Sequence, residues 1–171
     1  LKPDAPRYTI VAVSNAYARA TLARREDIVG RGLFEIFPNN PADPLADGVR
    51  NLAASLARVV ESGESDTMAV QKYDVRRSPE QGGGFDERWW SPVNSPAFDG
   101  SGRLQYLLHR VEDVTDYVRL TRLGDEQERV AAALRARTTL REAEVVSRAL
   151  ELQAVNDQLR AAYAEVSRLY L

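Results

Sequence analysis

The chain contains 171 residues, with 23 basic and 25 acidic side chains, one histidine and no cysteine. This near-neutral balance argues against a dedicated binder of nucleic acid or of an anionic membrane. The absence of cysteine excludes disulfides, thiolate zinc sites, iron–sulfur clusters and cysteine nucleophiles. No apolar run of 18 residues occurs, so we expect no membrane span. Since the chain opens without Met, we expect a cytoplasmic segment of a longer protein.

Helix-breaking residues divide the chain into two parts. All eight prolines lie at or before Pro96, and the last glycine is Gly124, so residues 125–171 contain neither. This run predicts a long helix, and because the last predicted strand ends at Val114 we place a folded domain over residues 1–115 and a helical segment over residues 116–171.

The domain begins with β-branched and aromatic residues at 8–14, which predict a strand. Asn15 follows as the expected N-cap of a short helix that reaches Leu22. Apolar side chains at helical spacing then predict a longer helix over residues 45–61, with Gly63 just past its end.

Three strands are predicted in the rest of the domain, over residues 67–76, 85–98 and 103–114. Strong turn signals at 79–84 and 99–102 separate them. This order of elements predicts an α+β fold in which an antiparallel sheet is flanked by short helices.

The tail carries a narrow seam whose members are spaced alternately by four and three residues. The seam consists of Val145, Ala149, Leu152, Asn156, Leu159, Tyr163, Val166 and Tyr170. A lone Asn at an a position is typical of a parallel two-stranded coiled coil, where it pairs with its mate. We therefore predict a parallel homodimer; the alternative is an amphipathic helix that packs on its own domain.

A second seam upstream has the same alternation but a different phase. It consists of Leu120, Leu123, Gln127, Val130 and Leu134, of which the four apolar residues are predicted core positions. Continued from Leu134, the count would place Arg137, Arg141 and Glu144 in a dry interface. We therefore predict a discontinuity between Leu134 and Val145, where a helix pair could switch.

Several strings resemble a PAS domain. Val13-Ser-Asn-Ala-Tyr17, Arg25-Glu-Asp-Ile-Val-Gly30 and Leu33-Phe-Glu-Ile-Phe-Pro38 resemble its first half. Glu112-Asp-Val-Thr115 resembles the Asp-Ile-Thr motif that closes many PAS domains and opens their signalling helix. The resemblance covers roughly residues 7–116 and includes the order of the elements. The tail resembles the signalling coiled coils that join PAS sensors to output domains, most often histidine kinases.

The resemblance implies a function. It suggests the sensory and dimerisation module of a bacterial two-component histidine kinase, which relays a signal through the coiled coil to a kinase domain downstream in the same chain. The segment itself is expected to be non-catalytic. The alternatives are a PAS sensor of a nucleotide cyclase or of a transcription regulator, and a structural dimerisation module that binds no ligand.

The signal relay is expected where the last strand becomes the helix. Asp113 and Thr115 stand at this point. We expect Thr115 or Asp116 to cap the helix and Asp113 to tie it to the sheet, so that strand and helix entry move together.

The residues leave the cofactor unidentified. Haem-binding relatives use a histidine on the long helix, and residues 45–61 contain none, which disfavours haem. Without cysteine, the flavin adduct of light-sensing relatives cannot form. A small organic ligand is the class left open. His109, followed by Arg110 on a strand, does not resemble a phosphoacceptor, and for it we favour a hydrogen-bonded structural role over ligand recognition.

A ligand pocket is hypothesised around Asn94, with Tyr73 and Arg50, and with Trp90 and His109 as further candidates. Trp89 and Trp90 are adjacent on a strand, so they point to opposite faces of the sheet and both faces should be covered. Core packing is the preferred role of either tryptophan.

No catalytic or metal site is expected. One histidine, no cysteine and no Gly-x-Ser-x-Gly string argue against a hydrolytic triad. Gly82-Gly-Gly84 lacks the lysine and helix of a phosphate loop and is expected in a hairpin. Adjacent carboxylates such as Asp86 and Glu87 point to opposite faces of a strand, so they do not form a simple metal site.

Overall fold

The computed structural model describes residues 1–169, apart from the side chains of 81, 161–163 and 165–169. The predicted seam residues Tyr163, Val166 and Tyr170 therefore lie outside the described side chains. Contacts within the chain divide it into two units, Leu1–Arg119 and Leu120–Leu171, close to the predicted border after residue 115.

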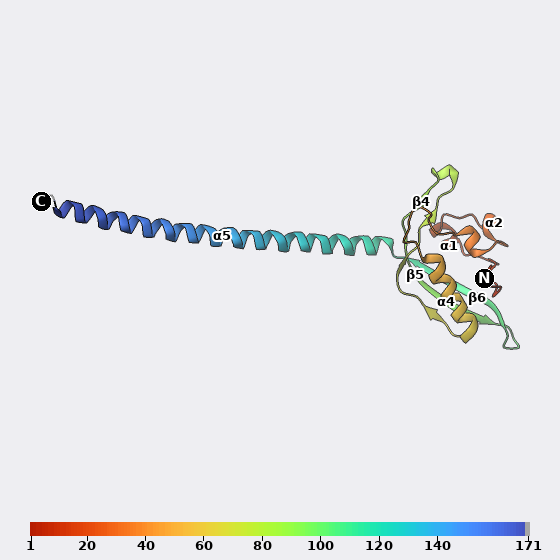
Figure 1. Ribbon diagram of the computed structural model, residues 1–171. Coiled ribbons are helices and arrows are strands. Elements are labelled where there is room, and N and C mark those ends of the chain that lie inside the picture. Colours follow the sequence, from red (N-terminus) through yellow and green to blue (C-terminus); the bar gives the residue numbers. More distant parts are fainter. Residues whose placement is uncertain (170–171) are drawn as a thin grey trace. The chain divides into compact units, whose positions relative to one another are not determined.

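The first unit is built around two long antiparallel strands, β5 (Trp89–Phe98) and β6 (Leu104–Asp113), which lie side by side in Figure 1. The turn between them is closed by the Asp99 carboxylate. It accepts hydrogen bonds from the N–H groups of Ser101 at 2.8 Å and Arg103 at 3.0 Å. This turn confirms the predicted break between the last two strands.

The opposite edge of β5 is covered by two short strands rather than the one predicted over 67–76. β1 (Asp66–Thr67) and β2 (Gln71–Lys72) both pair with β5. The interruption between them faces Pro92, which has no N–H to donate to a ladder. Instead, Pro92 accepts a hydrogen bond from the Met68 N–H at 3.0 Å.

A second, two-stranded sheet is formed by β3 (Val75–Arg76) and β4 (Phe85–Asp86). The 3-10 helix η1 (Pro79–Gln81) and the glycines at 82–84 connect the two strands, in agreement with the hairpin expected there. The predicted strand over 85–98 is therefore divided into β4 and β5.

The longest helix of this unit, α4 (Gly48–Ser62), lies along the sheet in Figure 1 and buries Leu52, Leu56 and Val59 against it. The helix begins later than predicted, because Leu45 is 86 % exposed and lies in the preceding loop. Its predicted end is confirmed, since Gly63 adopts the left-handed conformation with φ of 69°.

Three short helices precede α4: α1 (Asn15–Ala20), α2 (Arg25–Ile28) and α3 (Leu33–Ile36). The N-cap of α1 is Ser14, not Asn15 as predicted. The Ser14 hydroxyl accepts the Tyr17 N–H at 3.0 Å, whereas the Asn15 side chain accepts from Arg25 at 2.9 Å.

The strand predicted over 8–14 is wrong. Only an isolated bridge between Thr9 and Gly32 is present. Ile10 exchanges backbone hydrogen bonds with the loop at Gly30 and Arg31 instead of with a strand. The β-branched and aromatic composition has a different cause, because Tyr8 and Ile10 are buried in the core.

The helix α5 (Thr115–Leu169) is continuous through the predicted discontinuity between Leu134 and Val145. The two seams thus lie on one helix and differ only in phase. No helix among the described residues is both long and apolar enough to cross a membrane.

Candidate functional site

A small cavity of about 40 Å³ lies between the sheet and the short helices. That volume suits a water molecule rather than a ligand of drug size. Most of its lining is apolar. The lining residues are Tyr17, Thr21, Leu33, Phe37, Leu52, Gln71, Tyr73, Val75, Trp90, Pro92, His109 and Val111.

A larger groove of about 470 Å³ adjoins this cavity. It lies between residues 10–20 and the outer edge of β6, where residues 107–111 line it. Tyr17, His109 and Val111 line both spaces. The rings of Tyr17 and His109 meet edge to face, with centroids 6.1 Å apart. These side chains therefore separate the inner cavity from the groove.

His109 begins a chain of hydrogen bonds that crosses the interior. Its Nδ1 lies 2.6 Å from Oδ1 of Asn94, whose Nδ2 donates to the Ser55 hydroxyl at 2.7 Å. Ser55 in turn donates to the Asp66 carboxylate, which also pairs with Arg58 at 2.8 Å. The chain connects β6, β5, α4 and β1.

The two titratable residues at the ends of this series of hydrogen bonds, Asp66 and His109, each have a defined charge at neutral pH. The hydrogen bonds from Arg58 and Ser55 lower the pKa of Asp66, so this carboxyl is ionised at neutral pH. At the other end, burial lowers the pKa of His109 to about 4. His109 is therefore neutral at pH 7.

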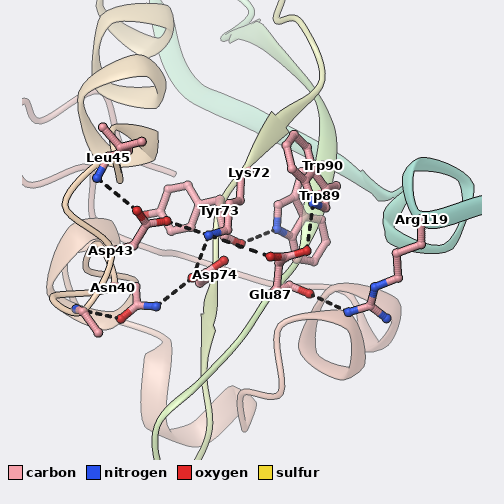
Figure 2. Close-up of polar contacts among 11 residues, drawn as sticks. Asn40, Asp43, Leu45, Lys72, Tyr73, Asp74, Glu87, Trp89, Trp90 and Arg119 are labelled. Atoms are coloured by element: carbon pink, nitrogen blue, oxygen red, sulfur yellow. Dashed lines mark hydrogen bonds and ion pairs between the residues drawn. The ribbon is translucent and has the colours of Figure 1, made fainter. Parts of the chain in front are cut away.

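A second polar cluster surrounds Lys72 on β2 (Figure 2). The ammonium group lies 2.6 Å from Asp43, 3.6 Å from Asp74 and 3.9 Å from Glu87. Asn40 donates to Asp74 at 2.7 Å, and the hydrogen bond that Lys72 donates to Asp43 contributes most to raising the pKa of Lys72. The cluster ties the loop before α4 to β2 and to the connection between β4 and β5.

The Lys72 cluster extends to the beginning of α5. The Trp89 indole donates to the Glu87 carboxylate at 3.3 Å, and Arg119 donates to the Glu87 carbonyl at 3.4 Å (Figure 2). Next to Lys72, the Tyr73 carbonyl accepts the Trp90 indole N–H at 2.8 Å. The residues next to Lys72 and Glu87 therefore contribute both to the wall of the cavity and to the hydrogen bonds with the first turns of α5.

The junction between β6 and α5 is held by Asp113. Its Oδ1 accepts the Thr115 N–H at 3.0 Å and the Thr115 hydroxyl, and its Oδ2 pairs with Arg88 at 2.8 Å. Thr115 is buried, and its hydroxyl accepts the Trp89 N–H at 3.0 Å. Although burial opposes it, these bonds lower the pKa of Asp113.

The expected tie between helix and sheet by Asp113 is thus present in the structure. The expected cap by Thr115 or Asp116 differs, because the carboxylate that accepts the first helical N–H comes from Asp113 and the Thr115 hydroxyl bonds to the sheet. A relay of signals through this junction stays a prediction.

The predicted pocket residues are distributed over three environments. Tyr73, Trp90 and His109 line the cavity. Asn94 is fully buried beneath His109 and holds its ring. Arg50 does not line the cavity, because its side chain is 77 % exposed and pairs with Asp47 at 2.9 Å.

Nine lining residues were not predicted as site residues, among them Tyr17, Phe37 and Gln71. Tyr17 and Phe37 occur in the strings that resemble a PAS domain, and this signal could have identified them. Gln71 has no local signal, since a polar residue in a short strand is ordinarily exposed.

The lining of the cavity favours contacts with apolar groups. Its apolar wall surrounds a neutral imidazole, and no group of three histidine, aspartate or glutamate side chains in the described part of the chain could hold a metal ion.

Solved structures of PAS and related sensor domains are similar to this chain at low identity. A light-oxygen-voltage domain studied with a flavin analogue is 20 % identical, with 74 % of this chain and 84 % of that chain covered and a TM-score of 0.49. A sensory box histidine kinase/response regulator from Burkholderia thailandensis is 22 % identical, with coverage of 69 % and 80 % and a TM-score of 0.40. The ligand- and DNA-bound VqmA of Vibrio cholerae is 22 % identical, with coverage of 65 % and 43 % and a TM-score of 0.44. These values identify neither a ligand nor an output domain.

No curated protein matches the chain. The family model described as PAS fold matches residues 5–119, which is more than half of the sequence and nearly all of the first unit. The antiparallel sheet, the short helices and the helical exit agree with the PAS domain expected from the sequence. The chain therefore belongs to the PAS fold family.

Proposed function

We propose that this chain is the sensory and dimerisation module of a histidine kinase. In this proposal, the PAS domain responds to a signal at its cavity or sheet, and α5 carries the response through a parallel coiled coil to a kinase domain. The junction at Asp113 carries the proposal, because it joins the sheet directly to the helix that bears both seams.

The exposure of the seams supports dimerisation. In the single chain, Leu120, Val130, Leu134, Val145 and Leu152 are at least half exposed. Further seam members in the same state are Leu123 and Leu159. Two exposed, mostly apolar seams of this kind are costly in water, and a second copy in parallel would cover them.

Sedimentation of the chain at micromolar concentration tests the proposal. The wild-type chain should sediment as a dimer. Asn156→Leu should yield a mixture of oligomers, because Asn at an a position restricts the number of strands at some cost in stability.

Gln158→Leu provides the matched control, since it adds the same side chain two residues away and outside the seam. It should sediment as the wild type does. A monomeric wild-type chain at micromolar concentration would refute the coiled coil, and identical behaviour of both variants would refute the position assigned to Asn156.

One observation favours a second candidate, a structural dimerisation module that binds no ligand. The cavity of about 40 Å³ has room for a water and for little else in this conformation. The two candidate functions differ in whether a small molecule binds in the cavity or in the groove beside it. A binding experiment with small molecules therefore distinguishes them.

A further inference from the structure

The tautomer of His109 is determined by the hydrogen bonds behind it. Asp66 is held ionised by Arg58, so its oxygens only accept, and the Ser55 hydroxyl must donate to it. The Ser55 oxygen then accepts from the Asn94 amide nitrogen. Asn94 consequently presents its carbonyl oxygen to His109.

A carbonyl oxygen can only accept a hydrogen bond, so Nδ1 of His109 must carry the proton. In a neutral imidazole, the other nitrogen then has a free lone pair. Nε2 makes no hydrogen bond to any described residue. The buried and unpartnered side-chain atoms in the described part of the chain are Asp74 Oδ1 and Arg77 Nε, so Nε2 is accessible from a cavity or groove.

The spaces around His109 determine what can reach this lone pair. The inner cavity has no charged side chain in its lining, and the groove has one, Arg110. The groove has room for a molecule that contains a ring, and Tyr17, Val111 and Ile10 contribute apolar surface to it. An anion would gain nothing from an acceptor lone pair.

We infer that this PAS domain takes a small, neutral and largely apolar molecule that donates one hydrogen bond to Nε2 of His109. This inference rests on the proposed sensory function and specifies its ligand class. Asp66 and Arg58 act as positioning residues, since they orient the ring through Ser55 and Asn94 without touching the ligand.

Nitrogen NMR of the full chain tests the inference directly. His109 is the only histidine, so all histidine ring signals belong to it and only its two nitrogens have to be distinguished. At pH 7 the uniformly labelled chain should show a protonated Nδ1 and an unprotonated Nε2. A protonated Nε2 would overturn the inference, and this measurement needs no variant.

Phenol and toluene serve as matched probes, because a hydroxyl in one replaces a methyl of similar size in the other. Phenol should shift the Nε2 signal and bind about 3- to 10-fold more tightly than toluene, the factor expected for one net hydrogen bond. Equal binding of the two probes, or no shift of Nε2 when phenol is added to millimolar concentration, would overturn the inference.

Ser55→Ala removes the hydroxyl that links Asn94 to Asp66 by hydrogen bonds. Both tautomers of His109 should then appear, and the preference for phenol over toluene should fall below about twofold. Ser62→Ala makes the same change at the exposed end of α4, where the hydroxyl donates to the Arg58 carbonyl and accepts the Glu64 N–H far from His109, and should leave the wild-type spectrum. A single unchanged tautomer in a folded Ser55→Ala variant would contradict the positioning role.

The experiments distinguish a failure of the proposed function from a failure of the inferred ligand class. A dimer whose His109 carries its proton on Nε2 would leave the proposed function intact and remove this ligand class. A monomer with the predicted tautomer and a preference for phenol would do the reverse.

Discussion

Asn94 is completely buried, although its amide group must form hydrogen bonds in order to be tolerated there. It is satisfied by His109 on one side and by Ser55 on the other. A buried amide with partners on two elements fixes their relative position, because any shift would leave one donor or acceptor unpaired. Asn94 thus adds a polar connection between the sheet and α4 to the apolar packing of Leu52, Leu56 and Val59.

The neutral state of His109 has a consequence for stability. In the unfolded chain its pKa is near 6.5, and in the folded chain it is about 4. As the pH falls from 6.5 to 4, His109 becomes protonated in the unfolded state but stays neutral in the folded state. The free energy of unfolding therefore decreases over this pH range. The loss should be about 2 kcal/mol, allowing for the half-buried position of the ring.

Chemical denaturation at pH 7 and at pH 4.5 measures this loss. His109→Asn serves as the reference because it cannot titrate, and the wild-type chain should lose more stability than this variant between the two values. Equal pH dependence of both proteins would show that His109 is not shielded from protonation.

At the scale of elements, the junction between β6 and α5 is a place where one hydroxyl serves two strands and a helix. Thr115 donates to Asp113 and accepts from the Trp89 N–H, while Arg88 holds the same carboxylate from the other side. The beginning of the helix cannot shift without breaking a hydrogen bond to β5.

Thr115→Val removes this hydroxyl but keeps the shape of the side chain. Because the hydroxyl's two hydrogen bonds, to the Asp113 carboxylate and from the Trp89 N–H, are lost, we expect a loss of about 1–3 kcal/mol and faster amide hydrogen exchange in residues 115–119. Thr138→Val is the matched control, since its hydroxyl bonds to Leu134 on the exposed surface of the same helix. Equal exchange in the two variants would show that the junction does not fasten the helix.

Some elements could be predicted because their signals are local. The helical spacing and Gly63 fixed the end of α4, and the glycines near residues 82 and 100 marked the turns. The strand predicted over residues 8–14 is wrong because Tyr8 and Ile10 are apolar side chains of the core. Composition alone does not distinguish such a buried segment from a strand.

The candidate site was only partly predictable for a related reason. Alternation along β5 placed Trp90 and Asn94 on one face, which the burial pattern confirms. The bond between Asn94 and Ser55 joins residues 39 positions apart, and the exposure of Arg50 depends on which side of α4 meets the sheet. Neither follows from spacing within one element.

At the scale of the whole molecule, the two seams of α5 are offset by a single residue. The first seam continued from Leu134 would use Glu144, whereas the second begins at Val145. Because the helix is continuous there, a dimer can satisfy one seam fully only by straining the other. Such competition is what a switch between two nearly equal states requires.

Deletion of Thr139 should place both seams in one phase. We expect the dimer to melt higher by about 2–4 °C, the shift expected for a chain of this length when a stabilisation of about 1 kcal/mol is added. Deletion of residues 138–144 removes a whole heptad and keeps the offset, so it should not raise the melting temperature. Thermal circular dichroism at matched concentrations compares them, and a lower melting temperature for the Thr139 deletion would exclude the offset as a source of strain.

The two adjacent tryptophans provide intrinsic fluorescent reporters, one at the cavity and one at the beginning of α5. Trp90 forms part of the cavity wall, and the backbone N–H of Trp89 donates to the Thr115 hydroxyl at the beginning of α5. They are the only tryptophans of the chain. Replacing one at a time with phenylalanine would assign the fluorescence to a single place, so that events in the cavity and at the helix entry could be timed against each other without an attached dye.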